Sequence, residues 1–368
     1  MHVKEIWNLK YNNTIIGLEL GDINNNGQTE LIAYTNTGEI LVISLTGQIL
    51  HKELILRNSP IWHLKVNDID NDGNNELLLG GMDGYLETYK CDINYNLDLF
   101  WRHKFGSSIS GILFDDINSD NLNEIIALSL DNTIRVLNSR NGDLIWGQVF
   151  EKGVGDAFIF STDKKTKELG ACGNDGTIRF FDGINGDLLW FKKYNDKIRC
   201  INFMNALNST LIIFGGDDKK IHFIDNYTQE EIKVIRFNDF VWKCFSFPFQ
   251  IHNKIIASSY SFAFFNNSTP LNNINFSSEM ICLNDNLKVL WKLIGFNFET
   301  LEIIETEDKI LILGGTTKGE IMIIDQMTGR ILWEEEIDSC SNKIKFYPEK
   351  RFFFSCHDNG LIKAYNLI

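Results

Sequence analysis

The sequence predicts an all-β fold: a single eight-bladed β-propeller of four-stranded blades. Three observations lead to this prediction. A motif that joins a Gly- or Asn-containing turn to an alternating apolar strand occurs eight times along the 368 residues. Successive copies lie about 40 to 48 residues apart, except for a gap near 60 between the fifth and sixth, and this interval is the length of a four-stranded blade. The chain also begins with an unassigned strand and ends without a fourth one.

The eight motifs supply the third strand of each unit. Apolar residues alternate with polar ones in them, which is the period of a strand and not of a helix. The turn and strand segments are residues 38–43, 83–89, 131–137, 175–181, 218–224, 279–283, 318–324 and 359–365.

Two strands precede each turn and one follows it. In the second unit, residues 61–66 and 76–81 are the first two strands. After the third strand, Asn-Gly or Thr-Gly opens a strand that carries Trp, as in residues 141–146, 185–190 and 328–333. The glycine provides the positive φ that a tight hairpin turn requires. We name the strands of each unit A, B, C and D in chain order.

The two ends of the chain predict how the ring closes. Residues 366–368 come directly after a C strand, and residues 5–10 resemble a D strand without a blade. If the N-terminal segment completes the last blade, backbone hydrogen bonds close the ring and no long sheet edge is exposed. We predict eight blades, with seven as the alternative because the sixth unit is irregular. Residues 1–368 are expected to form one propeller domain, with an insertion at about 262–276 in the sixth blade.

Composition narrows the classes of function. The formal net charge is -14 and the chain has no run of Lys or Arg, which argues against nucleic acid as a partner because phosphate binding needs several cations. The N-terminus is charged where a secretory signal is apolar, and no apolar stretch is long enough for a membrane span. Seven scattered cysteines without a CxxC pair fit a reducing compartment. We expect a cytoplasmic protein that forms a monomeric ring on its own.

Two repeat superfamilies share these motifs. The hairpins that carry Trp resemble the repeats of quinoprotein-like (PQQ-like, WD40-like) propellers and cover most of the chain. The first three units instead resemble FG-GAP repeats, which occur in integrin α-chain propellers and in Bardet-Biedl-type trafficking subunits. Both resemblances imply a β-propeller, but within such superfamilies the fold carries over far better than the function.

The resemblance to integrin-like repeats implies calcium in the A-to-B loop, bound by a D-x-D-x-D-G-x-x-[DE] segment. Unit two matches this pattern in full, unit three has Asn121 in place of the glycine, and unit one has fewer charges. The candidate ligands are Asp68, Asp70, Asp72 and Glu76 in unit two, Asp116, Asn118, Asp120 and Glu124 in unit three, and Asp22, Asn24, Asn26 and Glu30 in unit one. Calcium affinity follows ligand charge and rigidity, so we expect unit two to bind most tightly and unit one least.

A second interpretation of these loops stays open. Asp and Asn also cap tight turns by accepting hydrogen bonds from nearby backbone N–H groups, and such loops can persist without a metal. Units four to eight lack the motif.

An enzyme is the third reading, because quinoprotein dehydrogenases share the eight-bladed ring. Many of those enzymes carry a pair of adjacent cysteines against the cofactor, and this chain has no Cys-Cys pair. The seven histidines are scattered singly, without HxH or HExxH spacing, and no nucleophile elbow, P-loop or dinucleotide fingerprint occurs. We therefore predict no catalytic or cofactor-binding residue.

Partner binding is expected on the face that carries the D-to-A and B-to-C connections. Position-matched residues near the start of the A strands are Ile16, Trp62, Ser110, Asp156, Arg199, Trp242, Glu299 and Asn342. Trp and Arg are the side chains most enriched at interface hot spots, so Trp62, Arg199 and Trp242 are candidates, together with Phe264 and Phe265 in the insertion. The alternative is that both tryptophans fill space between blades.

These observations predict a non-enzymatic scaffold that mediates protein–protein interaction, either alone or as a subunit of a larger assembly. The first alternative is a calcium-dependent ligand-binding module, for example for carbohydrate. The second is a quinoprotein-like enzyme with a site that its sequence does not reveal.

Overall fold

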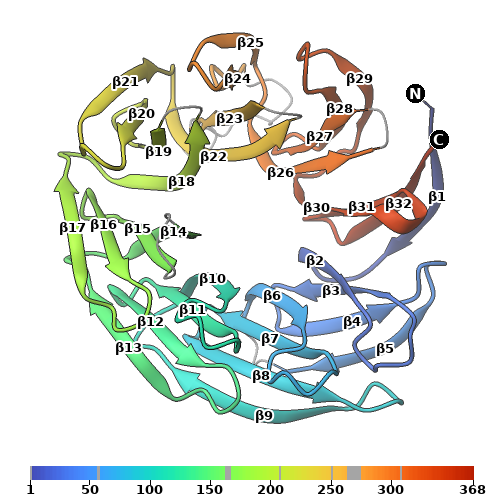
Figure 1. The fold of residues 1–368 in the computed structure, drawn as a ribbon. Coiled ribbons are helices and arrows are strands. Elements are labelled where there is room, and N and C mark those ends of the chain that lie inside the picture. Colours follow the sequence, from blue (N-terminus) through green and yellow to red (C-terminus); the bar gives the residue numbers. More distant parts are fainter. Residues whose placement is uncertain are drawn as a thin grey trace.

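Eight four-stranded antiparallel sheets stand around a common axis as the blades of a propeller (Figure 1). The computed structural model describes residues 2–55, 59–161, 167–206, 209–249, 252–262, 275–306 and 309–368. In each blade the A strand lies nearest the axis and the D strand lies at the outer rim (Figure 1). Eight blades, and not seven, are thus confirmed.

The first four blades follow the chain without interruption. Their strands are β2 (Ile15–Gly21), β3 (Glu30–Thr35), β4 (Glu39–Ile43) and β5 (Ile49–Leu54) in blade 1; β6 (Ile61–Asn67), β7 (Glu76–Gly81), β8 (Tyr85–Cys91) and β9 (Leu97–Lys104) in blade 2; β10 (Ile109–Asp115), β11 (Glu124–Ser129), β12 (Thr133–Asn138) and β13 (Leu144–Val149) in blade 3; and β14 (Val154–Ser161), β15 (Lys167–Gly173), β16 (Thr177–Asp182) and β17 (Leu188–Lys193) in blade 4.

The other four blades complete the ring. Their strands are β18 (Ile198–Ala206), β19 (Ser209–Gly216), β20 (Lys220–Asp225) and β21 (Glu231–Arg236) in blade 5; β22 (Phe240–Phe249), β23 (His252–Tyr260), β24 (Glu279–Asn284) and β25 (Val289–Ile294) in blade 6; β26 (Phe298–Glu305), β27 (Ile310–Thr316), β28 (Glu320–Asp325) and β29 (Ile331–Glu336) in blade 7; and β30 (Ser341–Tyr347), β31 (Phe352–His357), β32 (Leu361–Leu367) and β1 (Val3–Lys10) in blade 8, with a 3₁₀ turn, η3 (Pro348–Lys350), between β30 and β31.

The N-terminal strand closes the ring, as the sequence predicts. Strand β1 pairs antiparallel with β32, from Val3 opposite Leu367 to Lys10 opposite Leu361, and the two termini lie side by side (Figure 1). Trp7 of β1 then joins the last blade to the first, because its indole N–H donates to the carbonyl oxygen of Leu45 at 2.9 Å.

The Asn-Gly hairpins and the D-strand tryptophans form one inter-blade contact. Trp101 of blade 2 donates its indole N–H to the Ser139 carbonyl oxygen of blade 3 at 2.8 Å, and its ring covers Gly142. A Cβ atom on Gly142 would lie 2.5 Å from this ring, and the residue has a φ of 72°. Trp146 covers Gly186 of blade 4 in the same way. Glycine is therefore required both by the backbone conformation and by the ring that covers it.

The apolar core lies between adjacent blades. The B strands β3, β7 and β11 are buried along their whole length. One cluster joins Ile134 and Val136 of blade 3 to Ala157 and Leu169 of blade 4. Each blade is therefore stabilised by its two neighbours, which explains why the repeat must close into a ring.

Every A strand carries a β-bulge near its start. In blade 2, Ile61 and His63 pair with β7 and Trp62 between them does not. The bulged residues are Ile16, Trp62, Ser110, Gly155, Arg199, Trp242, Glu299 and Asn342. They match the sequence-aligned positions except in blade 4, where the bulge falls on Gly155 and Asp156 pairs with Cys172.

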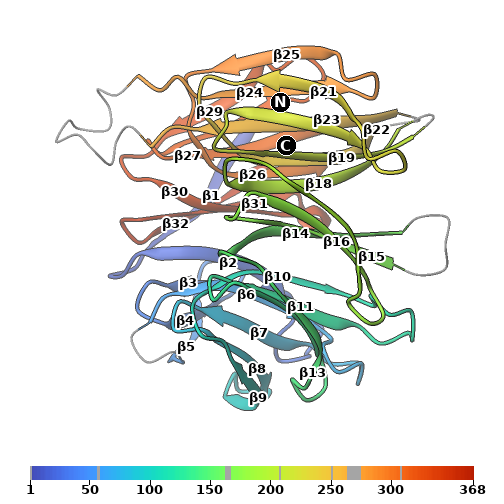
Figure 2. The ribbon, with the colours of Figure 1, turned by 90° about the vertical axis from the view of Figure 1, so that its left-hand side faces the viewer.

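The meander gives the ring two different faces (Figures 1 and 2). We call one the connection face, because it carries the D-to-A links between blades and the B-to-C turns. The other, the loop face, carries the A-to-B loops and the C-to-D turns.

Candidate functional site

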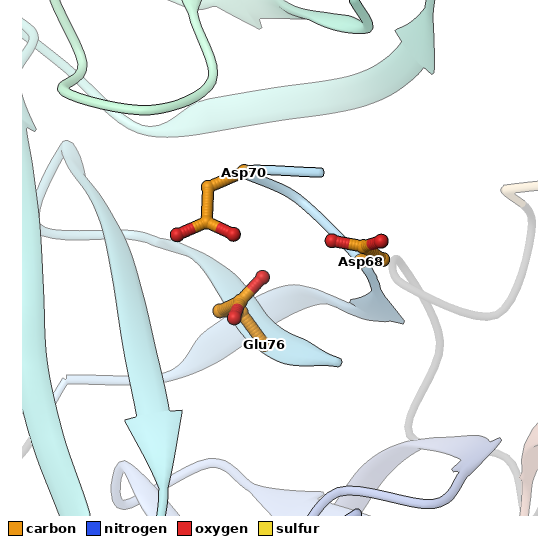
Figure 3. Close-up of side chains that lie close together, drawn as sticks. All are labelled: Asp68, Asp70 and Glu76. Carbon is orange, nitrogen blue, oxygen red and sulfur yellow. The ribbon is translucent and has the colours of Figure 1, made fainter. Parts of the chain in front are cut away.

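Three carboxylates of the unit-two loop on the loop face lie close together. Ligand atoms of Asp68, Asp70 and Glu76 lie within 4.8 Å of one another, and in the described part of the chain no other group of three His, Cys, Asp or Glu side chains does so (Figure 3). A side chain from the same blade lies among them. The ammonium of Lys90 on β8 is 2.7 Å from Asp70 Oδ2, 2.8 Å from Asp72 Oδ2 and 3.6 Å from Glu76 Oε1.

Lys90 supplies the positive charge that these carboxylates need. Burial lowers the pKa of Lys90, but its hydrogen bonds to Asp70 and Asp72 raise the pKa more, so the ammonium is protonated across the physiological range. The hydrogen bond from Lys90 also lowers the pKa of Asp72. The carboxylates of this loop thus suit a cation, and in this structure the ammonium of Lys90 is that cation.

The first Asp of each loop caps the turn. Asp68 accepts hydrogen bonds from the backbone N–H groups of Asp72 and Gly73, both at 3.0 Å. The same pair of bonds recurs in the other two loops: Asn26 and Gly27 donate to Asp22, and Asp120 and Asn121 donate to Asp116. These bonds hold the loop conformation without a metal.

The last Glu of each loop has a second structural role. Glu30, Glu76 and Glu124 are buried, and each accepts the backbone N–H of the residue that follows the first Asp, at 3.3, 2.8 and 3.1 Å. Burial raises the pKa of all three, that of Glu124 to about 7. No described cation lies beside Glu124 as Lys90 lies beside Glu76, so the Glu124 carboxyl is partly protonated near neutral pH.

In units one and three, neutral amide and phenol groups take part in the hydrogen bonds of the loops, where unit two has the ammonium of Lys90. Asn118 donates its side-chain N–H to Asp120 Oδ2 at 3.1 Å and to Glu124 Oε1 at 2.9 Å. In unit one, Tyr95 donates to Glu30 Oε1 at 3.2 Å, and Asn24 donates to the carbonyl oxygen of Ile93. The order of calcium affinity in the three loops stays a prediction.

On the connection face, an arginine lies among aromatic rings from blade 6. The guanidinium of Arg199 is 5.1 Å from the ring centroid of Trp242, 5.4 Å from that of Phe262 and 5.7 Å from that of Phe240. Asp217 fixes its orientation, since both carboxylate oxygens accept hydrogen bonds from the guanidinium. We call these residues the Arg199 cluster.

Of the remaining partner-binding candidates, the structure describes only Trp62. Trp62 is 36% exposed and lines a cavity at the ring axis, so it is not part of the Arg199 cluster. Phe264 and Phe265 lie outside the described residues, as does most of the 262–276 insertion. At its described end, Phe262 packs on Trp242 with a centroid distance of 5.6 Å.

The axial cavity has a volume of about 230 Å³ and opens among the bulged residues on the connection face. Its wall carries three lysines and two glutamates, besides an indole, an imidazole and an amide: Lys65, Lys243, Lys343, Glu19, Glu299, Trp62, His63 and Asn342. The sequence-based prediction reached the bulge positions but missed the lysines. Their positions in the sequence could have indicated two of them, because Lys243 and Lys343 each directly follow a bulged residue.

The described residues contain no helix with the length and hydropathy needed to cross a bilayer.

A family model described as KICSTOR complex protein kaptin matches residues 57–145, which is less than half of the chain. These residues reach from the start of blade 2 to the first residues of β13 in blade 3. None of the curated proteins matches the sequence.

Solved structures with the same arrangement share little sequence with this chain. The computationally designed protein Ika8 is 15% identical with a TM-score of 0.73, over 99% of each chain. BamB from Moraxella catarrhalis is 12% identical with a TM-score of 0.68 over the whole of both chains, and Sqt1 from Saccharomyces cerevisiae is 10% identical with a TM-score of 0.73 over 99% of each. At such identity the likeness establishes the fold alone. The chain has a β-propeller fold, with eight four-stranded blades and almost no helix.

Proposed function

We propose that this protein is a non-enzymatic scaffold that binds a protein partner through the connection face, as one subunit of a larger assembly. The Arg199 cluster is the observation that carries the proposal. Arg and Trp are enriched among interface hot spots, and Asp217 holds this arginine in place before any partner arrives. A fixed side chain loses little conformational entropy on binding.

Two further findings support a place in an assembly. The matched family is described as a protein of the KICSTOR complex, so its members act as subunits. The described residues also hold no cluster of potential metal ligands apart from the Lys90-paired loop on the opposite face.

The test compares half-buried Trp242 with an aromatic residue on the opposite face in quantitative affinity purification. Trp242→Ala removes the ring beside Arg199, and Tyr227→Ala is the matched control, because Tyr227 is 94% exposed on a C-to-D turn of the loop face. We expect Trp242→Ala to deplete a stoichiometric co-purifying protein at least tenfold and Tyr227→Ala to leave it unchanged. Thermal melting establishes that both variants are folded.

Either of two results would refute this assignment of the face. One is an unchanged set of co-purifying proteins for a folded Trp242→Ala variant that also carries Arg199→Ala. The other is an equal loss with Tyr227→Ala, which would place the interface on the loop face.

A further inference from the structure

Three lysines and two glutamates line the axial cavity, a local excess of positive charge in a chain whose net charge is -14. Lys65, Lys243 and Lys343 reach it from three different blades, and His63 also lines it. Lys345 lies two residues further along β30, where its ammonium is 2.7 Å from Glu19. The central strands of the ring thus bring together cations that are far apart in the sequence.

Among the described residues, the ammonium of Lys343 has no partner. It donates no hydrogen bond to a described residue, and no described carboxylate oxygen lies within 4.0 Å of it. Lys243 donates to the main-chain oxygen of Glu299, and Lys65 lies 3.7 Å from Glu19. A charge that is largely removed from bulk water without a counter-ion is costly, so this ammonium is a strong candidate for a ligand contact.

Glu19 and Glu299 also line the cavity, and both carboxylates already have donors of their own. Glu19 accepts from Lys345 and lies near Lys65, and Glu299 accepts the Tyr260 hydroxyl at 2.9 Å. Burial raises the pKa of Glu302, which faces Lys343 and Lys345 from β26. None of the three carboxylates neutralises Lys343 by direct contact.

The neighbouring groups respond to this excess of cations. Burial, and then the charges of Lys345 and Lys65, lower the pKa of Lys343. Burial lowers the pKa of Lys243 to about 8, and Lys343 contributes in the same direction. Burial together with Lys343 and Lys65 lowers the pKa of His63 to about 4, so this imidazole is neutral. An anion in the cavity would relieve the repulsion among these groups.

We propose that the axial cavity binds a phosphate group, with Lys343 as its principal contact and Lys243 and Lys65 as supporting cations. Lysine ammoniums are point charges that suit phosphate oxygens. The cavity volume of about 230 Å³ is larger than one phosphate requires, so the group can be presented by a larger molecule. Trp62 at the wall offers an apolar surface to the rest of that molecule.

Two sources can provide such a group: a small phosphorylated metabolite, or a phosphorylated side chain of a protein. The site does not depend on the proposed protein interface, since neither Arg199 nor Trp242 lines the cavity. The Trp242→Ala variant should therefore bind phosphate as the wild type does, whether or not it loses a partner.

The experiment is calorimetric titration of the full chain with inorganic phosphate, pyrophosphate and a phosphoserine peptide, at ionic strength held constant with chloride. We expect saturable binding at one site, weakened at least tenfold by Lys343→Met. The control is Lys193→Met, which removes an exposed lysine at the rim that pairs with Glu151. If the peptide binds at least tenfold tighter than pyrophosphate, the source is a modified protein; the reverse order points to a metabolite.

The unliganded Lys343→Met variant provides a second readout. Because it removes a poorly solvated charge without a partner, its melting temperature should equal or exceed that of the wild type. A lower melting temperature would mean that Lys343 has a structural role, which would overturn the proposal. So would the absence of saturable binding of any probe to the wild type, or unchanged binding by Lys343→Met.

Discussion

At the scale of single residues, Lys90 decides how the unit-two loop is neutralised. Its ammonium lies within hydrogen-bond distance of Asp70 and Asp72, where a calcium ion would compete with it. Replacing Lys90 with methionine should leave three carboxylates close together without a cation. In EGTA we expect the free energy of unfolding to fall by about 1–2 kcal/mol, because the ammonium of Lys90 pairs with several carboxylates.

The stability of the same variant should depend on calcium more strongly than that of the wild type. A ligand bound only by the native state raises the melting temperature with its concentration. Thermal melts in millimolar calcium and in EGTA measure both effects, and Lys90→Met combined with Asp70→Ala is the control that should lose the calcium response. If the melting temperature of the wild type itself rises by several degrees in calcium, the metal displaces Lys90. That result would favour the hypothesis of a calcium-dependent binding module.

The sequence alone reveals the carboxylates of this loop but not their partner. Asp68 and Glu76 belong to one short motif, and their spacing is visible along the chain. Lys90 comes from the C strand, and only the pairing of β7 with β8 brings it beside the A-to-B loop. Contacts made across a sheet depend on register, which a local motif does not encode.

At the scale of elements, a cation and an aromatic ring join successive blades near the connection face. In blade 3, Arg135 lies 4.3 Å from the ring centroid of Phe105 in blade 2 and pairs with Asp131. Arg179 repeats this contact in blade 4 with Asp175 and Phe150.

In blade 5 the cation is a histidine. His222 lies 5.2 Å from the ring of Tyr194 and contacts Asp218 at 2.9 Å and Glu231 at 2.7 Å. Both ring nitrogens face carboxylates, and they can both donate only when the imidazole is protonated.

This histidine should make stability depend on pH. Burial lowers the pKa of His222, but the hydrogen bonds to Asp218 and Glu231 raise it more, so it stands above the usual value. A group whose pKa is raised on folding makes its full contribution to the stability of the folded protein when the pH is below its unfolded pKa. That contribution disappears as the pH rises through the folded pKa. The free energy of unfolding of the wild type should therefore exceed that of His222→Gln by about 1.5–3 kcal/mol at pH 6, which is the range for hydrogen bonds to charged groups. The difference should be smaller at pH 9.

Urea unfolding at the two pH values measures this difference. Arg179→Gln is the matched control, because arginine stays charged throughout and its replacement should cost the same at pH 6 and pH 9. The assignment is wrong if the cost of His222→Gln is also independent of pH.

Most elements were predictable because each repeats a local pattern. The glycines of the C-to-D turns, such as Gly142 and Gly186, mark both a positive φ and the tryptophan that covers them. Blade 4 shows the limit, since its bulge falls on Gly155, one residue before the aligned Asp156. Alignment of the repeats assigns the strand, but the position of the bulge also depends on local packing. A Cβ atom on Gly155 would lie 3.2 Å from a backbone oxygen of the next blade, so little space is left for a side chain there.

At the scale of the whole molecule, stability depends on a closed ring. Each blade buries its apolar surface against two neighbours, so an opening at any point exposes two blade faces at once. The closure is made by β1, which pairs with β32, and by Trp7, which contacts Gly47 and Leu45 of blade 1.

Deleting residues 2–10 tests this closure directly. The deletion leaves blade 8 with three strands, exposes the edge of β32 and removes the contact between Trp7 and blade 1. We expect a lower melting temperature, a broader unfolding transition and a tendency to aggregate, because an unpaired edge strand is a template for association. A synthetic peptide of residues 1–12 added in trans should restore a sharp transition, whereas the same peptide with Trp7→Ala should restore it only in part. If the deleted protein melts like the full chain, the inter-blade core alone holds the ring together and β1 is dispensable for closure.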